Sequence, residues 1–270
     1  GLPEEGDREQ QTEVRLIQKL LMAFEDVDFY FCEWWARGVW LGSPERPLPR
    51  APALYDRKVK WPLKDEGTQL HGDWRTNYTS VRDHEAQVER QYREEVKEGL
   101  MEEITLGEAL DRYGKDLILA ATGAIAKKSS DPGGDVRVVF DGTNGVFLNL
   151  GIRIRDQIRF PTASDVKAVL SEMAEEGGAH WSLLFDVSKA HRRIPVLESE
   201  WGRQACQIKG SGAATAAMKR RGQAVVAGGA RRPAVRPMRR ADFSAKELSE
   251  KVFLNCVGTF GVTSAGYWWG

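Results

Sequence analysis

Residues 181–196 constrain the fold of this chain more than any other stretch. Five mostly apolar residues, 181–185, lead directly into Asp186, and the sequence becomes apolar again at 194–196. A short apolar run of this kind is typical of a buried β-strand, so we expect a strand that carries Asp186 at its exposed end. A carboxylate on a rigid strand end is a suitable oxygen ligand for Mg²⁺. The alternative is an acid in a surface loop.

Helical patterns occur before and after the middle of the chain. Apolar residues recur at spacings of three and four within residues 12–41, and a second helix is expected to begin near Ser80 and end at Gly99. A third helix is predicted over 164–176, where Ser164 and Asp165 suit a helix start. Four apolar residues are expected to form its buried face: Val166, Val169, Leu170 and Met173.

Strand patterns occupy the spaces between these helices. The runs 116–126 and 136–140 flank a turn rich in Asp, Pro and Gly, which predicts a β-hairpin. A further strand is predicted at 252–254, and a loop from Phe260 is expected to lead into a helix. Helices and strands in this order predict an α+β fold with a mainly antiparallel sheet packed with helices.

An aromatic cluster lies within residues 29–40 and contains five rings before Trp40. Such rings could stack on nucleic-acid bases, or they could form a packed face or a partner interface. We favour packing, because few basic residues lie between the rings. Four prolines between Pro44 and Pro52 then indicate a linker.

Composition excludes several classes of protein. Acidic and basic residues balance at 39 each, but residues 209–240 carry nine basic residues and no acid. That Ala-, Gly- and Arg-rich segment is either a nucleic-acid tether or a low-complexity insertion. The three cysteines and four histidines show no zinc-ligand spacing. The sequence shows neither a secretion signal nor a membrane span, so we expect a cytoplasmic or nuclear protein and, since it begins at Gly1, a fragment.

Three segments together resemble reverse transcriptases of the retroviral and retrotransposon type. Lys127-Lys128 and the strand from Arg137 to Asp141 are similar to the fingers hairpin of that family. The Asp186 segment resembles the first palm motif. The loop Phe260-Gly261-Val262-Thr263-Ser264-Ala265-Gly266 resembles the second, with Gly266 where proline is usual. The likeness covers about residues 77–270 and implies polymerase-like fingers and palm.

The resemblance also implies roles for individual residues. Asp186 is expected to be the catalytic metal ligand for Mg²⁺ or Mn²⁺, together with the backbone carbonyl of Val187. Lys128 and Arg137 are expected to grip the triphosphate of a dNTP. The other expected nucleotide-binding residues are Ala190, His191, Phe260 and Gly261. His191 stands where the family screens the sugar 2′-hydroxyl, although it could instead be an ordinary packed or exposed histidine.

The third palm motif of the family, an aromatic-x-Asp-Asp hairpin, is missing, because no two Asp residues are adjacent. One carboxylate cannot hold the two metal ions that nucleotidyl transfer uses. We therefore expect a polymerase fragment that is inactive by itself. Its expected domains are a helical and aromatic extension with a Pro-rich linker at 1–60, a fingers-like region at 61–160 and a partial palm at 161–270. A basic low-complexity insertion is expected within the last, at about 209–250.

The expected partners are an RNA or DNA template–primer and dNTPs, with no membrane and with the oligomeric state left open. Two other hypotheses are compatible with the same residues. The chain could be a non-catalytic RNA-binding module that keeps a polymerase-like fold, or the product of a degenerate retroelement gene. Taken alone, the hairpin could also be an ordinary solvated hairpin.

Overall fold

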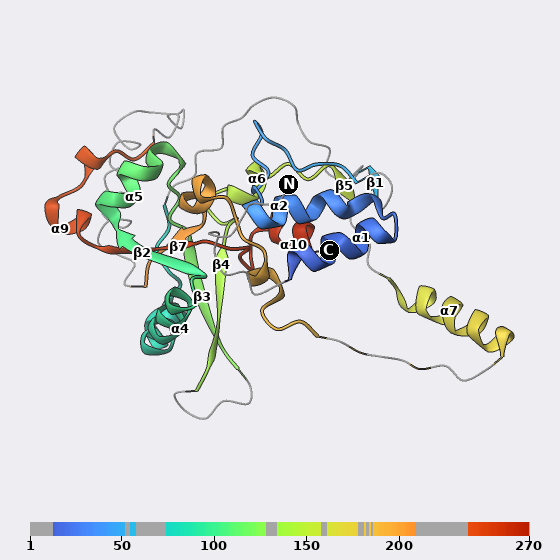
Figure 1. Cartoon of the computed structure of the whole chain (residues 1–270). Coiled ribbons are helices and arrows are strands. Elements are labelled where there is room, and N and C mark those ends of the chain that lie inside the picture. Colours follow the sequence, from blue (N-terminus) through green and yellow to red (C-terminus); the bar gives the residue numbers. More distant parts are fainter. Residues whose placement is uncertain are drawn as a thin grey trace, which may run out of the picture.

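The computed structural model of this chain is a mixed α+β structure, and the residues that it describes form three small antiparallel sheets (Figure 1). It describes residues 13–51, 55–57, 74–127, 134–157, 161–177, 181, 184, 186–208 and 237–269. Helices packed with antiparallel strands confirm the predicted fold class at this level. No helix in those ranges has both the length and the apolar character needed to cross a membrane.

The largest sheet lies at the centre of the core and has the strand order β2–β7–β6. Its strands are β2 (Met101–Thr105), β7 (Lys251–Asn255) and β6 (Ala205–Cys206). In the middle strand, Val252, Phe253 and Leu254 are at most 2% exposed, because a strand covers each edge of β7 and helices pack nearby. The strand predicted at 252–254 is therefore confirmed.

Two helices pack beside this sheet, α4 (Glu85–Lys97) and α5 (Leu106–Tyr113), and a third, α3 (Thr79–Asp83), packs against β3 (Ala121–Ala126), a strand of the predicted hairpin. The second predicted helix is thus divided into α3 and α4 at His84, and its apolar residues Val81 and Val88 are buried as the helical spacing requires. α5 begins with a capping box. The Thr105 hydroxyl accepts a hydrogen bond from the Glu108 amide, and the Glu108 carboxylate accepts one from the Thr105 amide.

The predicted hairpin is present as β3 (Ala121–Ala126) and β4 (Val136–Asp141). The register pairs Ala121 with Asp141 and Ala126 with Val136. The prediction was wrong about the beginning of the first strand. Residues 117–120 enter the core instead of pairing with β4, because Leu119 bridges to Ala205 beside the central sheet.

The amino-terminal pattern at 12–41 forms two helices, α1 (Val14–Ala23) and α2 (Phe31–Arg37), which lie beside α10 (Thr263–Trp269). The ring of Trp268 makes edge contacts with Trp34 at 5.9 Å and with Trp40 at 5.0 Å between centroids. These contacts confirm the prediction that the rings of Trp34 and Trp40 pack within the protein.

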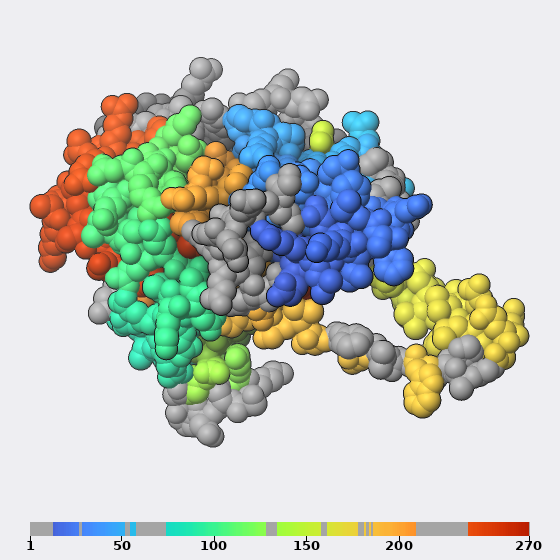
Figure 2. Space-filling view, viewed as in Figure 1, coloured from blue at the N-terminus to red at the C-terminus, as the bar shows by residue number. Residues whose placement is uncertain are grey.

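The helix predicted over 164–176 is present as α7 (Ala163–Glu176), with Thr162 and Asp165 forming its capping box. Its predicted buried face is wrong. Val166, Val169 and Leu170 are more than half exposed, and Met173 is half-buried. Figures 1 and 2 show the reason, since α7 stands away from the rest of the molecule.

The strand predicted at 181–185 is wrong at the positions that the structure describes. Neither Trp181 nor Leu184 belongs to a strand, and they are 87% and 98% exposed. An apolar run becomes a strand only beside a neighbour that satisfies its backbone, and neither Trp181 nor Leu184 takes part in a strand pairing.

The carboxyl-terminal part of the predicted insertion packs on the core. Met238 and Phe243 are buried, and the Phe243 ring stacks on Trp74 with centroids 5.4 Å apart. Arg240 forms an ion pair with Asp111 of α5 at 2.5 Å. Residues 237–250, which include α9 (Ala245–Leu248), are thus an ordered part of the fold, whereas 209–236 lie outside the described residues.

The remaining short elements connect these parts. They are β1 (Asp56–Arg57), β5 (Asp156–Gln157), α6 (Leu148–Gly151) and the 3₁₀ helices η1 (Val27–Tyr30), η2 (Gly114–Asp116), η3 (Ala190–Arg193), η4 (Glu198–Gln204) and η5 (Arg240–Asp242). β1 and β5 pair as a two-stranded ribbon. The buried carboxylate of Asp156 secures it by accepting hydrogen bonds from the Arg50 Nε and the Ala51 amide, both at 2.6 Å.

Candidate functional site

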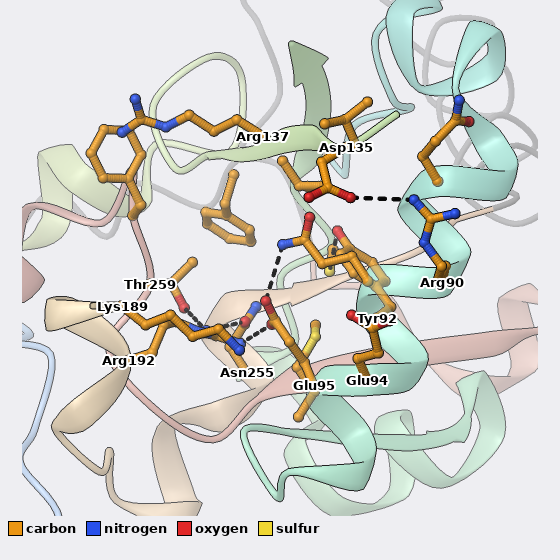
Figure 3. A pocket seen from close by; sticks show the side chains of 18 of the residues that line it. Arg90, Tyr92, Glu94, Glu95, Asp135, Arg137, Lys189, Arg192, Asn255 and Thr259 are labelled. Atoms are coloured by element: carbon orange, nitrogen blue, oxygen red, sulfur yellow. Dashed lines mark hydrogen bonds and ion pairs between the residues drawn. The ribbon is translucent and has the colours of Figure 1, made fainter. Parts of the chain in front are cut away.

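A pocket of about 410 Å³ lies between α4, the β3–β4 hairpin and η3 (Figure 3). Its charged and aromatic lining residues are the basic Arg90, Lys127, Arg137, Lys189 and Arg192, the acidic Glu94, Glu95 and Asp135, and the aromatic Tyr92, Phe140 and Phe260. Five basic against three acidic side chains leave an excess of two positive charges. The lining therefore suits a ligand that is anionic at one end and apolar or aromatic at the other.

The floor of the pocket is built around the guanidinium group of Arg192. Its Nη1 donates to Asn255 Oδ1 at 2.7 Å and to Thr259 Oγ1 at 3.3 Å, and its Nη2 donates to the Glu95 carboxylate. Glu95 also accepts a 3.0 Å hydrogen bond from Gln91. The side chains of Arg192 and Glu95 are only 13% and 11% exposed, so this ion pair fixes η3 against α4 and the end of β7.

The rim of the pocket carries ion pairs that are exposed to solvent. Asp135 lies 3.4 Å from Arg90 and 3.6 Å from Lys127, and the Lys189 ammonium lies 2.7 Å from Glu98. Exposed pairs of this kind contribute little to stability, because water screens them. An anionic ligand can therefore replace the carboxylates around these cations with only a small loss of free energy from the broken ion pairs.

The hairpin contacts the loop from Thr259 to Val262 at one side of the pocket. The guanidinium carbon of Arg137 lies 4.4 Å from the centroid of the Phe260 ring, and the ring of His191 lies 6.0 Å from the same centroid. Gly261 has φ +104°, and a Cβ there would lie 1.9 Å from the Phe140 carbonyl oxygen. Only glycine permits this approach of the loop backbone to β4.

The structure brings together four of the eight residues predicted for the site. Arg137, His191, Phe260 and Gly261 meet at this contact between hairpin and loop. The others lie elsewhere. Ala190 is half-buried in η3, and Asp186 and Val187 are exposed on the chain before η3, outside the pocket lining. Lys128 lies outside the described residues.

Sequence reasoning missed the polar floor, which consists of Gln91, Glu95, Arg192, Asn255 and Thr259. One signal was available. Glu95 follows Val88 and Tyr92 at helical spacing, and these three are the buried residues of α4. A carboxylate on the buried face of a helix requires a cation or several donors.

The metal site expected from the resemblance is incomplete among the described residues. Asp186 and the Val187 carbonyl would supply two oxygen ligands to the octahedral shell of Mg²⁺, in which waters and substrate phosphates commonly take other positions. In the described ranges, no three His, Cys, Asp or Glu side chains are grouped so that they could hold an ion. One carboxylate cannot hold two metal ions, so Asp186 and Val187 by themselves do not form the complete two-metal site for Mg²⁺ or Mn²⁺ that the resemblance implies.

Two buried ionisable groups of the pocket lining are kept neutral. The Cys206 thiol and the Tyr92 hydroxyl are 3.4 Å apart and buried. Burial raises the pKa of Cys206 to about 12 and raises the pKa of Tyr92 well above its ordinary value. Because a nucleophilic cysteine must be a thiolate, Cys206 contributes to packing and not to covalent chemistry.

Comparison with known proteins does not assign a family. No protein-family model matches this sequence, and no curated protein matches it. The function is therefore inferred from the pocket and from the motifs of the sequence.

Proposed function

We propose that this chain is the fingers and the front of the palm of a reverse-transcriptase-like polymerase, and that its pocket binds the triphosphate of an incoming dNTP. The reaction class is RNA-templated nucleotidyl transfer, with a template–primer as the nucleic-acid partner. One observation supports this most strongly. Arg137 and Phe260, which belong to two motifs far apart in the sequence, contact each other beside the pocket.

The chemistry of the lining agrees with a nucleotide triphosphate. Arg137, Lys127 and Lys189 lie around the pocket, and guanidinium and ammonium groups neutralise phosphate oxygens. Phe260 is 47% exposed and offers an aromatic surface on which a base or sugar can pack. The weak ion pairs of the rim hold the cations in place until an anionic ligand replaces the carboxylates.

For the described residues the proposal concerns binding and not the transfer step. Asp186 and Val187 do not complete a metal site, so the polymerisation chemistry needs ligands beyond those that these residues supply. Nucleotide binding at the pocket is separable from that chemistry, because it depends on the rim and the hairpin.

Calorimetric titration with dGTP tests the proposal. Arg137→Gln removes one guanidinium from the pocket, and we expect it to weaken binding about tenfold or more, since a hydrogen bond to a charged group contributes about 1.5–3 kcal/mol. Arg82→Gln is the matched control, because it makes the same change of charge on the exposed surface of α3. That control should bind within about twofold of the wild type.

Two results would refute the proposal. One is a wild-type chain that folds but does not bind dGTP, and the other is an equal effect of Arg82→Gln and Arg137→Gln. Salt-dependent binding of a template–primer without any dNTP binding would instead favour the non-catalytic RNA-binding module.

A further inference from the structure

Asn149, at the second position of α6, joins three segments of the chain through its side-chain amide. Its Nδ2 donates to the Thr143 hydroxyl and to the Gly261 carbonyl, both at 2.8 Å. Its Oδ1 accepts a hydrogen bond from the Thr263 amide at 2.9 Å. Both donors and the acceptor of the amide are thus used, and a flipped amide would lose the bonds to Gly261 and Thr263.

The surrounding backbone leaves little freedom for this arrangement. A Cβ on Gly142 would lie 3.2 Å from both the Asn149 Nδ2 and the Gly261 carbonyl oxygen. On the other side, Gly261 lies directly against the Phe140 carbonyl. The end of β4, the start of α6 and the loop around Gly261 therefore approach one another closely around the side chain of Asn149.

The position of Phe260 depends on the hydrogen bonds that join Asn149 to Gly261 and Thr263. Phe260 precedes Gly261 directly, and its ring lies against the Arg137 guanidinium of the hairpin. Because Asn149 bonds to Gly261 and to Thr263, it fixes the loop on the carboxyl-terminal side of that ring. A shift of the loop would move the aromatic surface and would also release Arg137 from its contact.

We infer that Asn149 is a positioning residue for nucleotide binding, which holds Phe260 against Arg137 and so sets the shape of the pocket. The inference rests on the proposed function for its ligand, a dNTP, but its structural part does not need a ligand. Asn149 does not line the pocket and acts only through the loop.

Asn149→Asp is the sharpest variant, because it has the same shape and keeps the acceptor for the Thr263 amide. It removes both donors and places a carboxylate oxygen against the Gly261 carbonyl. We expect dGTP affinity to fall about tenfold. Thr143→Ala is the matched control, since it removes one partner of the amide and leaves both bonds to the loop. It should change affinity by less than about twofold.

A double-variant cycle separates positioning from a general loss of structure. If Asn149 acts through Phe260, adding Asn149→Asp to Phe260→Ala should change dGTP affinity by less than about twofold. A full additive loss in that background would overturn the inference.

Hydrogen exchange tests the same inference without nucleotide. Asn149→Ala leaves the Thr263 amide without its acceptor, so amides in 258–264 should exchange faster, while those in the β3–β4 hairpin stay protected. Unchanged exchange in 258–264 would overturn the positioning role. Absence of dGTP binding by the wild type would instead refute the proposed function, so the two failures are distinct.

Discussion

Glu95→Gln should destabilise this protein strongly, although it replaces one side chain by another of nearly the same size. Glutamine removes the negative charge that the Arg192 guanidinium faces on the pocket floor, where the two side chains are 13% and 11% exposed. Breaking a buried ion pair by removing one partner costs about 3–5 kcal/mol, because the other charge remains buried. Asn255 and Thr259 still accept hydrogen bonds from Arg192, so we expect the lower end, about 3 kcal/mol.

Urea unfolding followed by circular dichroism measures this loss. For a chain of this size, about 3 kcal/mol also corresponds to a melting temperature lower by about 6–12 °C. Glu198→Gln is the control, because Glu198 pairs with Arg112 on the surface and is 68% exposed. That change should alter the free energy of unfolding by less than about 1 kcal/mol.

The double variant Glu95→Gln with Arg192→Met decides whether burial of an unpaired charge is the cause. With both charges removed, the loss should be smaller than the sum of the two single losses by about 2 kcal/mol or more. Additive losses, or a loss below about 1 kcal/mol in Glu95→Gln alone, would refute the interpretation of the floor as a coupled buried pair.

One further measurement on the unchanged protein and two further substitutions have expected outcomes. Cys206 should resist iodoacetamide at pH 8 in the folded protein, because its thiol stays protonated there. Its folded pKa of about 12 exceeds its ordinary value of 9.0. The contribution of this buried, protonated thiol to the free energy of unfolding should therefore be fully present below pH 9 and be lost as the pH rises toward 12, as alkaline urea titrations would show. Phe243→Ala should cost about 3 kcal/mol and alter the fluorescence of Trp74, on which the ring stacks. Thr105→Ala should cost about 1 kcal/mol by removing the cap of α5, with Ser249→Ala, outside that cap, as a control in the same urea assay.

Elements specified by neighbouring residues could be predicted from the sequence. The β3–β4 hairpin follows from two β runs around a turn rich in Pro and Gly. The helix α7 follows from apolar spacing with a polar start, which was predicted at Ser164 and Asp165 and is formed by Thr162 and Asp165. In both cases the residues that determine the element lie within it or beside it. Tertiary contacts are not needed to find them.

The partners of apolar surfaces could not be predicted in the same way. Val166 and Leu170 have the spacing of a buried helix face, and the residues before Asp186 have the composition of a strand, yet the described side chains there are exposed. Periodicity identifies which side of an element is apolar. It does not say which other element covers that side.

The residues of the candidate site show the same difference between local motifs, which the sequence reveals, and tertiary contacts, which it does not. Arg137 and Phe260 could be found because each belongs to a local motif, whereas Asn149 was missed because its bond to Gly261 spans 112 residues. Glu95 is an intermediate case. Its place beside Val88 and Tyr92 on one face of α4 predicts a buried carboxylate, and a buried carboxylate requires a cation. The sequence offers 39 lysines and arginines for that role, and only the packing of η3 against α4 selects Arg192. The local pattern therefore predicts only that Glu95 needs a cation or several hydrogen-bond donors, and the tertiary fold decides that Arg192 pairs with it.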